Sequence, residues 1–174
     1  CAEVQYKVPF GANTLKMPRD LMEKICSPAD ISLLRERDTF EFLKNVKTWS
    51  LGEKDKLTME RLFLLIEDQL GFYVFEEIEK TKRELSENLE SRFTFSYPGI
   101  DFVHEFSRNY FESITEQKVS EILSALDDTL LKAGVTPDAI DLVCCTGGTA
   151  KVHAIRMALE ARFGIKKLQQ YNNF

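Results

Sequence analysis

The spacing of apolar residues changes along the chain and divides its first half into a loop-like start and a helical region. Residues 1–18 alternate briefly and contain proline and glycine, which predicts extended chain and loop. Apolar residues then recur every three or four positions, the pattern of helices with one buried face. This pattern predicts a short helix over 19–26 and a second helical stretch from Ser27-Pro28 to Trp49 that can break near Asp38-Thr39. It also predicts a long helical stretch over 53–88 that is either broken or bent at Gly71.

The second half returns to alternation before becoming helical again. Phe93–Tyr97 and Ile100–Phe106 alternate on either side of Pro98-Gly99, which predicts a β-hairpin whose aromatic residues pack against the long helix. Ser107 is a typical N-cap and Gly134 a typical C′ residue. The pattern between them predicts two helices, with the second beginning near residue 116.

A strand, a glycine-rich turn and a helix follow in close succession. Leu142–Cys145 is an unbroken apolar run, typical of a strand buried on both faces. Val152, Ile155, Leu159 and Phe163 form one helical stripe, and a short strand is expected over 165–168. Between strand and helix lies Thr146-Gly147-Gly148-Thr149, the glycine turn. Such turns bring backbone N–H groups close to phosphate or ribose; a plain connection is an equal alternative.

Four polar residues share one face near the end of the long predicted helix. Glu79, Lys82, Arg83 and Ser86, the polar stripe, are spaced at i, i+3, i+4 and i+7. By spacing alone, surface ion pairing is the preferred interpretation. Against a sugar or an anion, the glutamate would accept a hydroxyl group while the other three side chains donated hydrogen bonds.

Composition narrows the class of protein. Of the 174 residues, 44% are hydrophobic and 29% charged, which is typical of a globular protein, and the helices and strands expected along the chain predict an α/β fold. The net charge of −5 argues against a general nucleic-acid binder, and no apolar run is long enough to span a membrane. Four scattered cysteines and two histidines give no metal-ligand spacing, so reduced thiols and a cytoplasmic location are expected. The start at Cys1 predicts a piece of a longer protein.

Four stretches in the same order resemble the seventy-kilodalton heat-shock chaperones of DnaK type. Glu79-Lys80-Thr81-Lys82-Arg83-Glu84-Leu85-Ser86 is similar to the family's E-x-x-K-x-x-L-S helix, and Phe106–Glu112 is similar to I-T-R-x-x-F-E. Gly134–Asp141, followed by Gly147–Val152, resembles the approach to G-G-S-T-R-I-P. The similarity covers about residues 75–168. The helical region before residue 71 resembles the divergent, bacterial YegD-like branch.

The resemblance implies lobe II of an actin-like ATPase, helix-rich with a β-hairpin and a long helix, and ATP or ADP between two lobes. Residues 1–90 would form a helical, subdomain IIB-like part, and 91–174 would complete the lobe. The polar stripe would approach adenine and ribose, and Gly147, Gly148 and Thr149 would lie along ribose and α-phosphate. Lys151 would stack near the base. With these implied roles, the ligand interpretation of the stripe is preferred over the surface ion pair.

The resemblance also has departures and leaves alternatives. Thr149, Ala150 and Lys151 stand where the family has Ser, Thr and Arg, and lysine lacks arginine's planar surface. The family's adenosine-contacting Asp falls at Asn173 or Phe174. Mg²⁺ and the catalytic groups would belong to lobe I, so this chain should not hydrolyse ATP although its parent is expected to.

Partners and alternative functions complete the expectations. Lobe I, and a nucleotide-exchange factor or coupled domain docking on the apolar-rich region 19–70, are the expected partners, without nucleic acid or membrane. The alternatives are an interaction module that kept the fold without nucleotide, and a lobe of a sugar-kinase relative.

Overall fold

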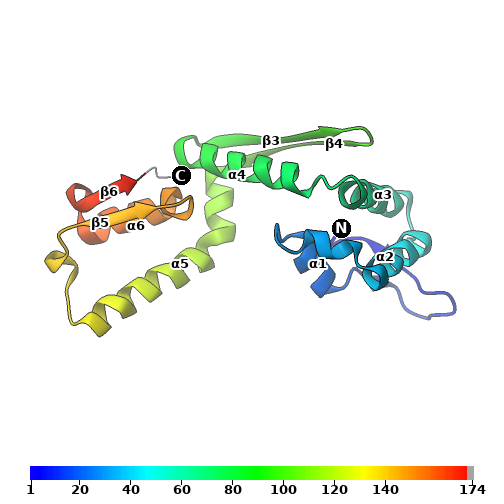
Figure 1. Cartoon of the computed structure of the whole chain (residues 1–174), viewed down its shortest axis with the longest axis horizontal. Helices are drawn as coiled ribbons and strands as arrows, with labels where there is room; N and C mark the ends of the chain where they lie inside the picture. The colour runs from blue at the N-terminus through cyan, green and yellow to red at the C-terminus, as the bar shows by residue number, and fades with distance from the viewer. Residues whose placement is uncertain (172–174) are drawn as a thin grey trace. The chain divides into compact units, whose positions relative to one another are not determined.

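The computed structural model describes residues 1–171, which divide into two compact units (Figure 1). Unit 1 comprises Cys1–Glu77 and Thr94–Phe102, and unit 2 comprises Ile78–Phe93 and the chain from Val103 onward. One helix and the hairpin therefore contribute residues to both units. The boundary expected after residue 90, between a subdomain IIB-like part and the remainder of lobe II, stays a prediction.

Unit 1 begins with two short strands and continues as helices. β1 (Gln5–Tyr6) pairs antiparallel with β2 (Leu15–Lys16). The helical elements that follow are α1 (Arg19–Ile25), the 3₁₀ helix η1 (Ile31–Arg35), α2 (Arg37–Trp49) and α3 (Glu53–Glu67). The extended start and the helices expected from apolar spacing are therefore confirmed, although the second helical stretch begins at Ile31 and not at Pro28, because 28–30 form a turn.

Apolar residues of the strands and helices form a single core in unit 1. Leu34, Leu43, Val46 and Met59 are fully buried, and the ring of Tyr6 stacks on Trp49 with centroids 6.5 Å apart. Of the apolar side chains over 19–70, only Leu33, Leu51 and Leu57 are large and exposed. Because this internal core accounts for the excess of apolar residues, the reason for placing a partner on region 19–70 is lost.

The helical stretch predicted over 53–88 forms two helices. α3 ends at Glu67, and α4 (Gly71–Glu87) begins after a turn in which Gln69 adopts a φ of 55°. A Cβ at Gly71 would lie 3.0 Å from Cγ2 of Ile31, a tight contact that the Ile31 side chain would have to relieve by moving. Of the two alternatives expected at Gly71, a break and a bend, the break is confirmed. Phe72 and Tyr73 are exposed at the start of α4.

The predicted hairpin is formed by β3 (Glu90–Tyr97) and β4 (Ile100–Ser107). Phe93 is buried and Phe95 half-buried, so the aromatic face of β3 is covered as expected. In β4, Phe102 and Val103 are both about half exposed, so the expected alternation of burial holds for the first strand only. The turn needs glycine, since Gly99 has a φ of 85°.

Unit 2 contains α5 (Arg108–Ala133), a continuous helix where two were predicted. Its ends follow the prediction: Ser107 Oγ accepts a hydrogen bond from the Tyr110 N–H, and Gly134 closes the helix with a φ of 66°. At the expected junction, the Thr115 hydroxyl donates to the Phe111 carbonyl. Such back-bonding bends a helix without ending it, and the ribbon of α5 bends along its length (Figure 1).

The last part of unit 2 is a small parallel α/β arrangement. Its elements are η2 (Pro137–Ala139), β5 (Val143–Thr146), η3 (Thr149–Lys151), α6 (His153–Phe163), η4 (Ile165–Lys167) and β6 (Leu168–Tyr171). β5 and β6 pair in parallel, with Val143 opposite Leu168 and Thr146 opposite Tyr171. The core between sheet and helices consists of Cys145, Ile155, Leu159 and Phe163.

Three details of this part differ from the predictions. The 3₁₀ helix η3 separates the glycine turn from α6, which begins only at His153. The last strand begins at Leu168, because 165–167 form a 3₁₀ turn. β5 is covered on one face only, since Cys145 is buried whereas Cys144 is exposed. The position expected for the adenosine-contacting Asp, Asn173 or Phe174, lies outside the described residues.

The adjacent cysteines should react at very different rates. Burial, followed by the neighbouring Cys144, raises the pKa of the Cys145 thiol, and only the thiolate reacts quickly. Under native conditions at pH 8, we expect alkylation of Cys144 to be at least about tenfold faster than that of Cys145. Peptide mapping by mass spectrometry measures both rates. Equal rates in folded protein, with a difference no larger than in urea, would contradict the placement of Cys145 in the core.

Within residues 1–171, no helix is long and apolar enough to cross a membrane. The same residues contain no group of histidine, cysteine or acidic side chains that could hold a metal ion.

Candidate functional site

The polar stripe and the glycine turn line one pocket in unit 2. Its volume is about 240 Å³, and its lining residues are Glu79, Lys82, Arg83 and Ser86 from α4, and Gly148, Thr149 and Val152 from the chain around η3. All four residues of the stripe therefore lie at a common pocket with the turn, although more than sixty residues separate the two segments. Two residues expected at the site, Gly147 and Lys151, are not among the lining residues.

The polar stripe on α4 contains one ion pair, between Glu79 and Lys82, and one cation without an ion-pair partner in the described chain, Arg83. Lys82 Nζ lies 2.6 Å from Glu79 Oε1, and the Ser86 hydroxyl donates to the Lys82 carbonyl at 3.2 Å. An exposed pair of this spacing contributes only a few tenths of a kcal/mol, so a ligand could displace it at small cost. The exposed Arg83 guanidinium makes no ion pair with any described residue.

The two glycines of the turn have different structural roles. Gly147 has a φ of 77°, a backbone conformation that residues other than glycine rarely adopt. Gly148 has ordinary helical angles, φ −67° and ψ −36°, and a Cβ added there would meet no atom within 4 Å. Because neither backbone geometry nor packing requires glycine at 148, its effect in the pocket is to leave the backbone uncovered.

The N–H groups available at the turn differ from those of an α-helix start. The Lys151 N–H donates to the Gly148 carbonyl, and the Val152 N–H donates to the Thr149 carbonyl. These hydrogen bonds form η3, and the first of them occupies the Lys151 amide, which an α-helix beginning at Gly148 would have left free. A ligand would therefore contact the turn over a short stretch that ends before Lys151.

Two side-chain contacts connect the helices that carry the pocket. Their residues were not among those predicted for the site. His153 Nδ1 lies 2.9 Å from Glu112 Oε1, which joins the start of α6 to α5. Arg108 Nε donates to the Leu85 carbonyl at 2.8 Å, which joins α5 to the last turns of α4. Arg108 and Glu112 both belong to the stretch that resembles I-T-R-x-x-F-E, and this resemblance was the one signal that could have indicated them.

Comparison with known proteins identifies the family. Residues 68–173, more than half of the chain, match the Hsp70 protein family model. The chain therefore belongs to the Hsp70 family, and its fold is that of a helix-rich lobe with small sheets from an actin-like ATPase.

Individual relatives agree with this assignment at low identity. The chaperone protein HscA homolog of Shewanella amazonensis is 27% identical over 78% of this chain and 23% of its own length. A heat shock protein of Pyricularia oryzae is 29% identical over 55% of this chain and 16% of its own length. For a heat shock protein homolog of Lachancea kluyveri, the identity is 27% over 49% of this chain and 13% of the relative. The chain thus spans less than a quarter of the length of these relatives.

Proposed function

We propose that this chain is part of the nucleotide-binding domain of an Hsp70-type chaperone and contributes the adenosine side of an ATP or ADP site. The observation that carries the proposal is the pocket shared by the polar stripe and the glycine turn. A surface stripe that served only for ion pairing would have no reason to lie beside an uncovered turn. Family membership supports the same function.

Each side chain of the pocket would have a distinct role toward adenosine. Glu79 would accept a hydrogen bond from a ribose hydroxyl group, and Lys82 and Ser86 would donate hydrogen bonds. Arg83, whose guanidinium has no ion-pair partner within 1–171, would stack on the adenine ring. Gly148 and Thr149 would pass along ribose and the α-phosphate. Gly147 would set the turn's conformation, and Lys151 would act from outside the pocket lining.

The size of the pocket supports a partial site. Its volume of about 240 Å³ is below the roughly 300–1,000 Å³ typical of ligand pockets, so it would enclose only part of a nucleotide. The β- and γ-phosphates, with Mg²⁺, would be held by lobe I of the same protein, as the resemblance implies. This chain alone should therefore bind weakly, with a dissociation constant on the order of millimolar.

The finer features of the parent protein are part of the proposal as well. We place it in the YegD-like branch and in the cytoplasm of a bacterium, and we expect a nucleotide-exchange factor or coupled domain as a partner, without assigning a surface. A fold retained for protein interaction alone is the alternative, and absence of nucleotide binding would favour it. The Hsp70 match gives no support to the sugar-kinase alternative.

Replacing Arg83 with alanine should weaken ADP binding about fivefold, because it removes a stacking cation worth about 1 kcal/mol. ADP titrated into the ¹⁵N-labelled chain, followed by NMR, measures the affinity and maps the site to the pocket. Lys80→Ala is the control, since Lys80 is exposed on the same helix and does not line the pocket. Equal losses in the two variants, or shifts confined to residues outside the pocket, would contradict the proposal.

A further inference from the structure

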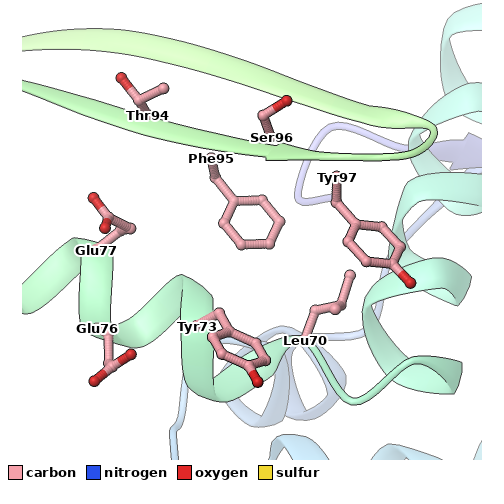
Figure 2. A pocket seen from close by; sticks show the side chains of 8 residues that line it. All are labelled: Leu70, Tyr73, Glu76, Glu77, Thr94, Phe95, Ser96 and Tyr97. Atoms are coloured by element: carbon pink, nitrogen blue, oxygen red, sulfur yellow. The ribbon is translucent and has the colours of Figure 1, made fainter.

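A second and larger pocket lies entirely within unit 1 and is not used by the proposed nucleotide site. Its volume is about 500 Å³, and it is lined by the start of α4 and by consecutive residues Thr94–Tyr97 of β3 (Figure 2). Figure 2 shows the Phe95 and Tyr97 rings extending from the hairpin toward α4, where Tyr73 and Leu70 lie opposite. Three aromatic rings therefore surround one space.

The chemistry of this pocket fits an organic cation. Aromatic ring faces attract guanidinium and ammonium groups, and carboxylates complement their charge. Glu76 and Glu77 lie along α4 at the same pocket, which has no basic residue in its lining. The Glu76 carboxylate is exposed and forms no ion pair with any other residue of the described chain. An anion would meet only negative charge here.

The walls of the pocket are held in place by contacts within unit 1. The Tyr97 hydroxyl donates a hydrogen bond to the Asp68 carboxylate, and this bond, followed by desolvation, raises the pKa of Tyr97. The hairpin tip is seated against α3, because the space beyond Gly99 is filled by Leu64 Cδ1. The hairpin tip and the Tyr97 ring are therefore positioned before any ligand binds.

Two further observations favour a protein segment over a small molecule as the source of the cation. β3 has β4 as its one strand neighbour in the described chain, so its other edge carries backbone groups without a strand partner. The pocket touches four successive residues of β3 and so extends along the backbone, beyond the area one guanidinium needs. Phe72 and Tyr73, 67% and 58% exposed at the start of α4, add apolar surface for neighbouring side chains.

We propose that this pocket binds an arginine or lysine side chain presented by an extended segment of a partner protein. The cation would lie among Tyr73, Phe95 and Tyr97, with Glu76 supplying the opposite charge. The residues that flank it would lie along β3. This proposal does not depend on nucleotide binding, because every residue of the pocket belongs to unit 1 and none belongs to the polar stripe or the glycine turn.

The test compares a charged peptide with a neutral one of the same size. The peptide Ac-Thr-Val-Arg-Val-Thr-NH₂ and its citrulline counterpart are titrated into the ¹⁵N-labelled 174-residue chain, with free arginine amide as a third ligand. We expect the arginine peptide to shift the resonances of Tyr73, Glu76 and Phe95. The citrulline peptide should bind at least about fivefold more weakly, since it loses both the cation–π contact and the ion pair.

Variants of the chain locate the site. Glu76→Gln should weaken the arginine peptide about threefold, and Tyr73→Leu by a similar factor. Glu87→Gln, on the same helix but outside the pocket, should leave the affinity unchanged. Both glutamates are exposed, so neither substitution should disturb the fold. Dispersed NMR spectra of the variants would verify this. Raising the salt concentration should also weaken binding, and ADP titrations of Glu76→Gln should match those of the unmodified chain.

Four results would overturn the proposal. Equal affinity of the arginine and citrulline peptides would show that charge is not recognised. Arginine amide binding as tightly as the peptide would show a site for small organic cations instead of a partner segment. Equal losses in Glu76→Gln and Glu87→Gln would indicate attraction to the acidic helix as a whole. Absence of any shift would leave the pocket without a cationic ligand.

Discussion

Replacing Leu43 with alanine should lower the free energy of unfolding of unit 1 by about 2–5 kcal/mol. Leu43 lies in α2 with no exposed surface, and its side chain belongs to the single apolar core of this unit. Alanine would lose the burial of the removed atoms and leave a cavity that neighbouring helices could fill only in part. A loss of this size is a large fraction of the stability of a small unit.

Trp49 reports this unfolding directly, because it is the chain's one tryptophan and packs on Tyr6 within unit 1. Urea titrations followed by its fluorescence measure the change. Leu57→Ala is the matched control, since Leu57 is 45% exposed on α3 and its truncation should cost less than about 1 kcal/mol. Similar losses in the two variants would contradict the assignment of α2 to the core.

The effect of Leu43→Ala on unit 2 tests whether the two units unfold independently. Amides of α6 should keep their protection from hydrogen exchange in Leu43→Ala, because the core of Ile155, Leu159 and Phe163 is separate from that of unit 1. Loss of protection in both cores together would show that the two units unfold as one.

Replacing Gly148 with alanine should weaken ADP binding by about tenfold or more, roughly 1.4 kcal/mol, without destabilising the fold. The backbone angles of Gly148 suit alanine, and its Cβ would meet no protein atom within 4 Å. The methyl group would instead enter the pocket at the point where a ribose or phosphate would approach the backbone. Such separation of binding from stability is unusual for a glycine and makes this the most selective test of the nucleotide site.

Gly147→Ala gives the opposite pattern and serves as the control. Its φ of 77° would strain an alanine, at a cost of about 1–2 kcal/mol, whereas Gly147 does not line the pocket. Thermal unfolding measures the stability of each variant, and NMR titration measures its affinity for ADP. If Gly148→Ala binds ADP as well as the unmodified chain, the nucleotide does not lie against the turn and the proposed function fails in this form.

Local signals in the sequence were sufficient to predict most elements whose ends carry a characteristic residue. Ser107 begins α5 through its side chain, and Gly134 and Gly164 end helices at positive φ. The hairpin follows from alternation around Pro98-Gly99. These signals depend on residues within a few positions of one another, so they do not require the rest of the fold. The same signals also placed the polar stripe on one face of its helix and identified the glycine turn.

Boundaries without such a signal were decided by packing. The turn at Gln69 has no glycine at the residue with positive φ, and Gly71 packs closely against the side chain of Ile31, forty residues earlier in the chain. The apolar pattern predicted a new helix near residue 116, yet α5 continues through this point, where the Thr115 hydroxyl donates to the Phe111 carbonyl. Burial was also decided at this level: Cys144 and Cys145 are chemically identical neighbours, and only the position of α6 makes one of them part of the core.

The two pockets show most clearly what could not be predicted from the sequence. Periodicity showed which residues of α4 share a face, but the resemblance to a family was needed to expect the glycine turn beside them. The aromatic pocket was not predicted at all, because Tyr73 and Phe95 belong to different elements and each fits an ordinary apolar pattern. A pocket is formed by side chains from segments far apart in the chain, and their meeting is fixed by how helices and hairpin pack, which no spacing within one segment encodes.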